Sequence, residues 1–252
     1  MPYRLYITNK NYSSWSLRPW LLLRQLAIPF VEDLRPLVSG SYRQPQWLEF
    51  SPVAHVPCLH VLPDSDSPTQ EPIILWESLA IVEYLNENHP EKNVYPSEPR
   101  ARAWARSAVA EMHAGFEAVR QEMGMNVGVR VQLSDEAFTP ALRKDLKRLD
   151  ELWSEGLSRF GGPFLAGREF TAVDAFYAPV VLRFGTYLGT LERMGEKARG
   201  YVEMMTGLEG VREWVGDALR EEGREVLHDA ESVEGVGRRL VEDLRKGGEG
   251  KE

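Results

Sequence analysis

The sequence predicts a small α/β unit followed by an all-helical unit. Strand and helix signals alternate over roughly the first 90 residues, and a stretch rich in proline and charge follows. Beyond it, apolar residues recur at the three- or four-residue spacing of helices. We therefore expect an α/β domain at residues 1–90, a linker at 91–100, a helical domain with a substrate site at 101–228, and a charged, flexible tail at 229–252.

The chain opens with an alternating strand. Tyr3, Leu5 and Ile7 alternate with Arg4, Tyr6 and Thr8, which is the two-residue period of a half-buried strand. A polar turn cluster occupies residues 9–14, and residues 17–26 form an apolar, helical run. This predicts a strand, a turn and a helix in that order.

The rest of the N-terminal unit reads as further strands and a helix. Residues 30–37 are a weaker strand candidate, and the short apolar runs 58–62 and 73–76 flank a loop full of turn formers. This pair predicts a hairpin. Ser78 is a candidate N-cap for the helix that follows.

Two long apolar stripes dominate the second half. One runs from Trp104 to Met123 and predicts one long helix. The other runs from Leu142 to Phe160 and is preceded by Thr139-Pro140, an N-cap followed by proline at the first helical position. Residues 171–174 carry a capping-box pattern before another apolar helix, and residues 208–219 predict a further one.

Charge and cysteine content exclude several functional classes. The 30 Lys and Arg residues against 38 Asp and Glu give a net charge of −8, which argues against a general nucleic-acid binder. Cys58 is the only cysteine, so an internal disulfide is impossible, and a structural zinc site would need several Cys and His ligands. The first residues lack an apolar leader and no apolar run is long enough for a membrane span. We expect a cytoplasmic protein with no metal, nucleic-acid partner or membrane partner.

Two candidate sites lie at the starts of predicted helices. Ser13 and Ser14 stand where free backbone N–H groups and the helix dipole favour an anion, such as a thiolate. Glu77 and Ser78 follow a strand directly, so the helix start and the carboxylate together suit an amino-acid head group. For both sites, simple helix capping is the alternative.

Two further patterns are less specific. Val56-Pro57 leads into a strand, and a cis bond there would display the Val56 backbone to a bound peptide, whereas an ordinary trans proline is the alternative. His113 on the long helix suits acid–base chemistry, or else it is a packing residue.

Taken in this order and spacing, these patterns resemble the cytosolic glutathione transferases. The resemblance covers Tyr3 to Leu219 and is strongest with serine-type members of the zeta and tau kind. The stretch 11–23, which contains NYSSWSLRPW, is also similar to a group of bacterial and fungal transferases. The residues that carry the resemblance are Ser13-Ser14-Trp15-Ser16-Leu17-Arg18, Ser51-Pro52, His55-Val56-Pro57, Glu77-Ser78-Leu79-Ala80-Ile81, and Thr171 with Asp174.

The resemblance implies a thioredoxin-like domain followed by an all-α bundle, with glutathione as co-substrate. It implies that Ser13 donates a hydrogen bond to the glutathione sulfur, and that Ser14 and Trp15 line the same site. It also implies a homodimer that acts in detoxification.

The remaining glutathione contacts implied by the resemblance fall on two short segments. Val56 would pair through its backbone with the cysteinyl part, beside a cis Val56–Pro57 bond, and His55 would reach the glycyl carboxylate. Glu77 and Ser78 would hold the γ-glutamyl group.

The sequence departs from two classes of the family. Zeta members usually carry cysteine where Trp15 stands, which weakens an isomerase assignment of the zeta kind. Omega and lambda members carry cysteine at the position of Ser13, and a hydroxyl there disfavours thiol–disulfide exchange.

The electrophile is expected on the long helix, against Met112, His113, Phe116 and Met123, and core packing is the alternative for this apolar stripe. The leading hypothesis is a glutathione transferase that stabilises the thiolate for attack on a hydrophobic electrophile. The alternatives are a glutathione-dependent isomerase or ether-cleaving enzyme, and a non-enzymatic glutathione-binding scaffold.

Overall fold

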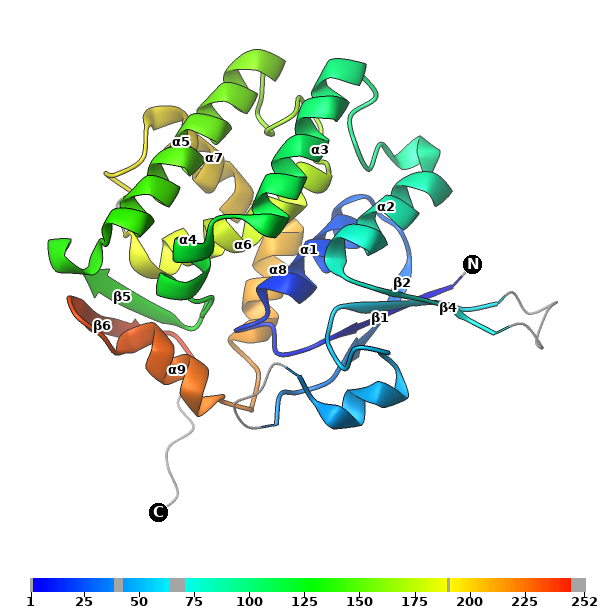
Figure 1. Ribbon diagram of the computed structural model, residues 1–252, viewed down its shortest axis with the longest axis horizontal. Helices are drawn as coiled ribbons and strands as arrows, with labels where there is room; N and C mark the ends of the chain where they lie inside the picture. Colours follow the sequence, from blue (N-terminus) through cyan, green and yellow to red (C-terminus); the bar gives the residue numbers. More distant parts are fainter. Residues whose placement is uncertain (1, 39–42, 64–70, 190, 246–252) are drawn as a thin grey trace.

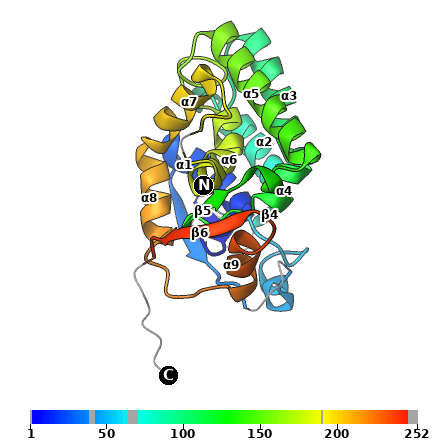
Figure 2. The same cartoon turned by 90° about the vertical axis from the view of Figure 1, so that its left-hand side faces the viewer.

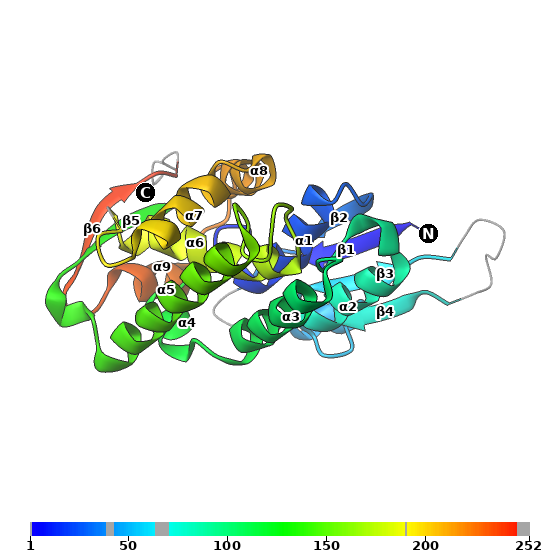
Figure 3. The same cartoon turned by 90° about the horizontal axis from the view of Figure 1, so that it is seen from above.

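The computed structural model describes residues 2–38, 43–63, 71–189 and 191–245. A unit built around a small sheet lies beside a larger helical unit, as Figures 1 and 3 show. The predicted class, a thioredoxin-like α/β domain followed by a helical domain, is confirmed. The last residues of the expected flexible tail, 246–252, and most of the hairpin loop lie outside the described residues.

The N-terminal sheet has four strands in the order β2-β1-β3-β4. β1 (Tyr3–Ile7) pairs in parallel with β2 (Phe30–Leu34) and antiparallel with β3 (Cys58–Val61), and β3 pairs antiparallel with β4 (Ile73–Trp76). Local alternation and turn chemistry thus predicted each strand and the hairpin correctly.

Two helices pack against this sheet. They are α1 (Ser14–Gln25) and α2 (Ser78–Asn88), with short 3₁₀ turns at Pro45–Glu49 and Pro90–Lys92. Leu17 and Leu21 of α1 are fully buried, so apolar burial fixes its position between the sheet and the helical unit.

The helical unit is organised around α6, which packs against α1, α3 and α7. Nearly every residue of α6 is buried, which makes it the central helix of the molecule. The helices of this unit are α3 (Pro99–Ala114), α4 (Glu117–Glu122), α5 (Pro140–Phe160), α6 (Ala172–Tyr187), α7 (Glu196–Thr206) and α8 (Glu209–Ala218), with a 3₁₀ turn at Asp135–Ala137.

The predicted helix starts of α5 and α6 are confirmed. Thr139 accepts a hydrogen bond from the Leu142 backbone N–H at 3.0 Å, with Pro140 at the first helical position. Thr171 and Asp174 form a reciprocal capping box. Ser78 is the first residue of α2 instead of its cap, because Glu77 occupies the N-cap position.

The single helix expected from Trp104 to Met123 is wrong. The structure has two helices there, α3 and α4, separated at Gly115 and Phe116. Phe116 has a left-handed backbone with φ of 54°. The apolar spacing conceals the break because Phe116 and Val119 remain buried in the same core on either side of it.

The all-helical domain expected at 101–228 and the described part, 229–245, of the tail expected at 229–252 are also corrected. Val226–Val233 forms α9, and β6 (Arg238–Asp243) pairs antiparallel with β5 (Val129–Leu133). Figure 2 shows this ribbon between α6 and α9. Val129 and Val131 of β5 are buried, so the charged β6 strand is held by a ladder to an apolar partner more than a hundred residues away in sequence.

Within the part of the chain that the structure describes, no helix is both long enough and apolar enough to cross a membrane.

The buried Asp174 carboxyl group makes the free energy of unfolding depend on pH, and this can be tested. Its fully buried carboxylate accepts hydrogen bonds from the backbone N–H groups of Leu165 and Thr171, both at 3.0 Å, and from the Tyr201 hydroxyl at 3.1 Å. Burial raises its pKa from 3.8 to about 6, although these hydrogen bonds act in the opposite direction. We expect Asp174→Asn to lower the free energy of unfolding by about 2 kcal/mol at acid pH, since one backbone donor loses its acceptor.

The sign of the pH effect follows from the raised pKa. The folded wild type holds the Asp174 proton between pH 4 and 6 whereas the unfolded chain releases it, so this contribution to stability is present at low pH and is lost as the pH rises through about 6. The deficit of Asp174→Asn should therefore shrink between pH 4.5 and pH 7 in urea titrations. A deficit that grows over this range would contradict the prediction.

Candidate active site

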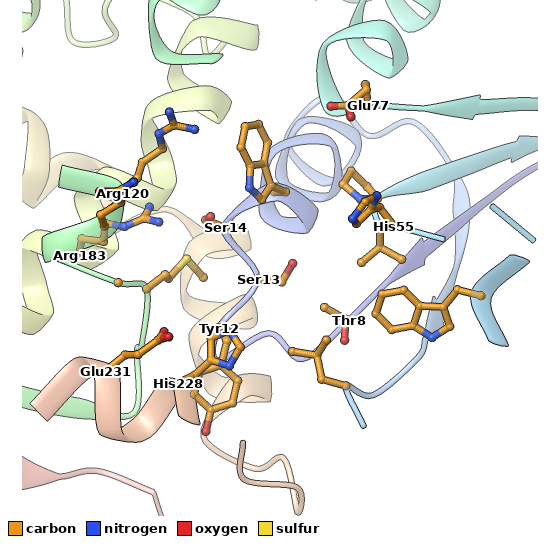
Figure 4. Close-up of a pocket in the computed structure, with 18 of the residues that line it drawn as sticks. Thr8, Tyr12, Ser13, Ser14, His55, Glu77, Arg120, Arg183, His228 and Glu231 are labelled. Atoms are coloured by element: carbon orange, nitrogen blue, oxygen red, sulfur yellow. The ribbon is translucent and has the colours of Figure 1, made fainter. Parts of the chain in front are cut away.

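A cavity of about 760 Å³ opens between the two units. Its walls come from the start of α1, the segment before β3, the start of α2, the loop after α4, and α9. Figure 4 shows Ser13 near its middle, with His55 and Glu77 on one side and Arg120 and Arg183 on the other. Ser13, Ser14, Trp15, His55, Val56, Pro57 and Glu77 are the predicted glutathione-site residues that line it.

Ser13 performs the capping role and is still accessible. Its Oγ accepts a hydrogen bond from the Ser16 backbone N–H at 3.3 Å and lies 2.8 Å from the Ser16 Oγ, to which it donates. A hydroxyl proton rotates freely, so the Ser16 hydroxyl can supply this bond instead. The Ser13 hydroxyl is then free to donate into the cavity. Ser14 is more buried than Ser13, at the first position of α1.

The loop before Ser13 is tied to the C-terminal part of the chain by a polar cluster that we call the clasp, made of Tyr12, Asn126, Asp229 and Arg245. The Asp229 Oδ1 accepts hydrogen bonds from the Tyr12 hydroxyl at 2.9 Å, the Asn126 Nδ2 at 2.9 Å and the Arg245 Nη1 at 2.6 Å. Burial raises the pKa of Tyr12, so its hydroxyl stays protonated and donates. The clasp places α9 beside the cavity.

The opposite wall carries the backbone features that were predicted for it. The Val56–Pro57 bond is cis, and His55 is exposed while Val56 is partly buried. Glu77 is exposed at the N-cap of α2 with φ of 70°, a strained conformation for a residue with a side chain. The Ser78 Oγ is buried and has no hydrogen-bond partner. It lies directly behind Glu77 in the chain but does not itself line the cavity.

The Trp15 ring packs between the side chains of Arg18 and His113. The Arg18 guanidinium lies 4.1 Å from its ring centroid, and His113 contacts it edge-on at 5.4 Å between centroids. The pKa of His113 is lowered, first by burial and then by Arg18, so the imidazole is neutral at pH 7. His113 packs against Trp15 and is not one of the residues that line the cavity.

The predicted electrophile residues of the apolar stripe belong to the core. Met112 and Met123 are fully buried and Phe116 is 6% exposed, and none of the three lines the cavity. The physical reason is that α3 packs against α6 and α4 against α5, and Phe116 between them packs against Tyr177 of α6.

Several lining residues were missed from the sequence, including Arg120, Gln121, Met125, Arg183 and His228. They come from α4, the following loop, α6 and α9, so no local motif joins them. The signal that could have been used was Arg183, a cation within the apolar run of α6.

Cys58 has no part in the cavity. It is fully buried in β3, and its Sγ donates to the Phe50 carbonyl at 3.3 Å. Burial raises its pKa to about 12, so it remains a protonated thiol. Among the described residues, no group of three or more His, Cys, Asp or Glu side chains is placed to hold a metal ion.

Comparison with known families explains this arrangement. Residues 12–88 match the glutathione S-transferase N-terminal domain and residues 100–217 match its C-terminal domain. The chain belongs to the glutathione S-transferase family. The two matched segments contain the α1 and α2 starts on one wall of the cavity and Arg120 and Arg183 on the other.

Relatives of known sequence and structure agree with this membership. The chain is 26% identical to "Glutathione S-transferase 1" of Dianthus caryophyllus over 74% of this chain and 79% of that protein, and 24% identical to "Maleylacetoacetate isomerase" of Rattus norvegicus over 70% and 76%. A glutathione transferase homologue from a Burkholderia strain, solved with bound glutathione, superimposes with a TM-score of 0.59 at 20% identity, covering 86% of this chain and 98% of that one. At 20% identity, the similarity to this solved structure supports the fold alone.

Removing the Tyr12 hydroxyl tests the clasp. We expect Tyr12→Phe to lower the free energy of local opening at α9 by about 1 to 2 kcal/mol, because Asp229 loses a donor and the Glu225 backbone N–H, 3.2 Å from the hydroxyl, loses its acceptor. Hydrogen exchange of the amides at 226–233 would measure it. Tyr6→Phe, in β1 and stacked on Phe50, is the matched control. Unchanged exchange in Tyr12→Phe would show that the clasp does not hold α9.

Proposed function

We propose that this protein is a serine-type glutathione transferase in which Ser13 stabilises the glutathione thiolate for attack on an electrophile. The observation that carries the proposal is the place of Ser13. Its hydroxyl stands at the start of α1 in a cavity whose one wall offers a backbone edge at Val56 and a helix start at Glu77. Family membership and transferase relatives support the reaction class.

The groups on that wall fit glutathione. The start of α2, where the unpartnered Ser78 Oγ is buried just behind the cavity lining, suits the γ-glutamyl carboxylate, and the exposed Glu77 carboxylate suits its ammonium group. The Val56 backbone suits the cysteinyl amide, and His55 suits the glycyl carboxylate. We assign these contacts as the glutathione site.

The chemistry follows from thiol ionisation. A free thiol has a pKa of about 8.5, and each unit of depression corresponds to about 1.4 kcal/mol of preferential thiolate binding. When Ser16 donates to Ser13, the Ser13 proton is free to donate to the sulfur, and the dipole of α1 adds to this. The thiol proton leaves to solvent. The sulfur electron pair forms the new carbon–sulfur bond, and in a displacement the leaving group departs with its bonding electrons.

A glutathione-dependent isomerase is the second candidate, because a relative named maleylacetoacetate isomerase aligns over most of the chain. Trp15, where zeta members carry cysteine, favours the transferase. Retention on immobilised glutathione followed by turnover of a chlorodinitrobenzene-type electrophile separates both enzymes from a non-enzymatic scaffold.

We further propose that the protein is a cytoplasmic homodimer with a role in detoxification, as its resemblance to the cytosolic glutathione transferases implies.

Ser13→Ala tests the catalytic assignment. We expect kcat for conjugation to fall roughly 100-fold while the glutathione Kd changes less than about threefold, since a single donor to the developing charge is lost. The pKa of bound glutathione, read from thiolate absorbance, should rise toward that of the free thiol. Ser14→Ala is the control for register. If Ser14→Ala is the damaging variant, the sulfur lies one residue further along.

Glu77→Gln tests the γ-glutamyl site. The side chain keeps its size and loses its charge, so we expect the glutathione Kd, measured by calorimetry, to rise about tenfold through loss of a charge-assisted bond to the ammonium group. Glu87→Gln, an exposed glutamate of the same helix, should leave the Kd unchanged. Equal Kd values for the two variants would remove Glu77 from the site.

A further inference from the structure

The cavity wall contributed by the helical unit is lined by arginines. Arg120 at the end of α4 and Arg183 in the middle of α6 both line the cavity, and Figure 4 shows them across Ser13 from Glu77 and His55. Arg183 is buried and its Nε donates to the Met123 carbonyl at 2.7 Å. The main chain thus holds this guanidinium at the cavity wall.

A third arginine lies behind this wall. Arg18 is 1% exposed, and its Nε and Nη1 have no hydrogen-bond acceptor. It packs on the rings of Trp15 and Phe176, at 4.1 and 4.8 Å from the guanidinium carbon to the centroids. The pKa of Arg18 is lowered to about 9, first by burial and then by the positive charges of Arg183 and Arg120.

Arg120 has the same deficit. Its Nε is buried without an acceptor, and its guanidinium carbon lies 5.8 Å from the Trp15 ring centroid. Neither Arg18 nor Arg120 forms an ion pair with a carboxylate of the described residues. Buried cations that lack a counter-charge destabilise a fold, and an anion bound beside them offsets that cost.

We propose that Arg120 and Arg183, backed by Arg18, form a carboxylate subsite for the second substrate. The inference rests on the proposed function, in which both carboxylates and the ammonium of glutathione are taken on the Glu77 and His55 side of Ser13. A carboxylate on the Arg120 side therefore belongs to the electrophile. A guanidinium offers paired N–H donors that match a carboxylate in one plane.

The substrate class is an apolar electrophile that carries a carboxylate. Trp15 and Met125 offer an aromatic and a thioether surface on the same wall for its apolar body. Its reacting carbon would lie beside Ser13, with the carboxylate directed away from glutathione. Glu231 also lines the cavity but is exposed on α9, so water screens its charge more than that of the buried Arg183.

A matched pair of electrophiles tests the subsite. Conjugation of a chloronitrobenzoate is compared with that of the chloronitrobenzamide of the same substitution pattern, each divided by its uncatalysed rate with glutathione. We expect the carboxylate to be preferred in kcat/KM at least tenfold in the wild type. Arg120→Gln should reduce this preference about tenfold, and Arg120→Lys should restore part of it. Arg212→Gln, an exposed arginine of α8 outside the cavity, is the control and should keep the full preference.

Glutathione binding, measured by calorimetry in every variant, separates the two proposals. An equal rate for carboxylate and amide with glutathione bound normally would overturn the subsite and leave the transferase standing. Displacement of glutathione by the unreactive methylnitrobenzoate would also overturn it, since the arginines would then belong to the glutathione site. Failure of the wild type to bind glutathione would overturn the proposed function and this assignment together.

Discussion

The position of Ser13 depends on the buried polar loop just before it, residues 9–12. This loop is too polar to be held by apolar contact, so each of its groups needs a partner. The Lys10 backbone N–H donates to the Glu221 carboxylate at 2.6 Å, and the Asn11 side chain bonds Asn126 at 3.0 Å and the Gly128 N–H at 2.8 Å. Together with the clasp, these bonds fix Ser13 relative to the helical unit. The active site is thus assembled by contacts between residues more than a hundred positions apart.

This dependence explains what sequence reasoning could and could not find. The strands β1 to β4, the cap at Thr139 and the capping box at Thr171 arise from patterns within ten residues, and all were predicted. Three features depend on partners far away in the chain: the break at Gly115, the β5–β6 ladder, and the cavity wall that carries Arg120 and Arg183. A stripe of apolar residues shows that a helix face is buried but not whether it faces a core or a cavity, which is why Met112 and Met123 were misplaced.

The wall proposed for glutathione carries sequence signals that the wall proposed for the electrophile lacks, for a physical reason. In the proposed site glutathione is held by helix starts and by a backbone edge, and these leave local marks such as a serine before a helix or a proline before a strand. Side chains that reach into a cavity from three separate helices leave no such mark. The identity of residue 15 shows the difference: Trp15 falls in a readable motif, yet its contact with Arg18 emerges only from the fold.

The overall charge of −8 and the charge around the cavity act in opposite directions. Glutathione is anionic, and so is the proposed second substrate, so the field of the whole protein gives neither of them long-range attraction. Cys58, buried with a pKa of about 12, supplies no nucleophile, and the reactive sulfur must arrive with glutathione. In the proposed site, capture of both ligands therefore depends on short-range donors: the starts of α1 and α2 on one side of Ser13, and the guanidinium groups on the other. Because Arg183 is buried and the Arg120 Nε is shielded from water, solvent ions screen these groups weakly, so they can act on a bound anion in spite of the distant negative charge.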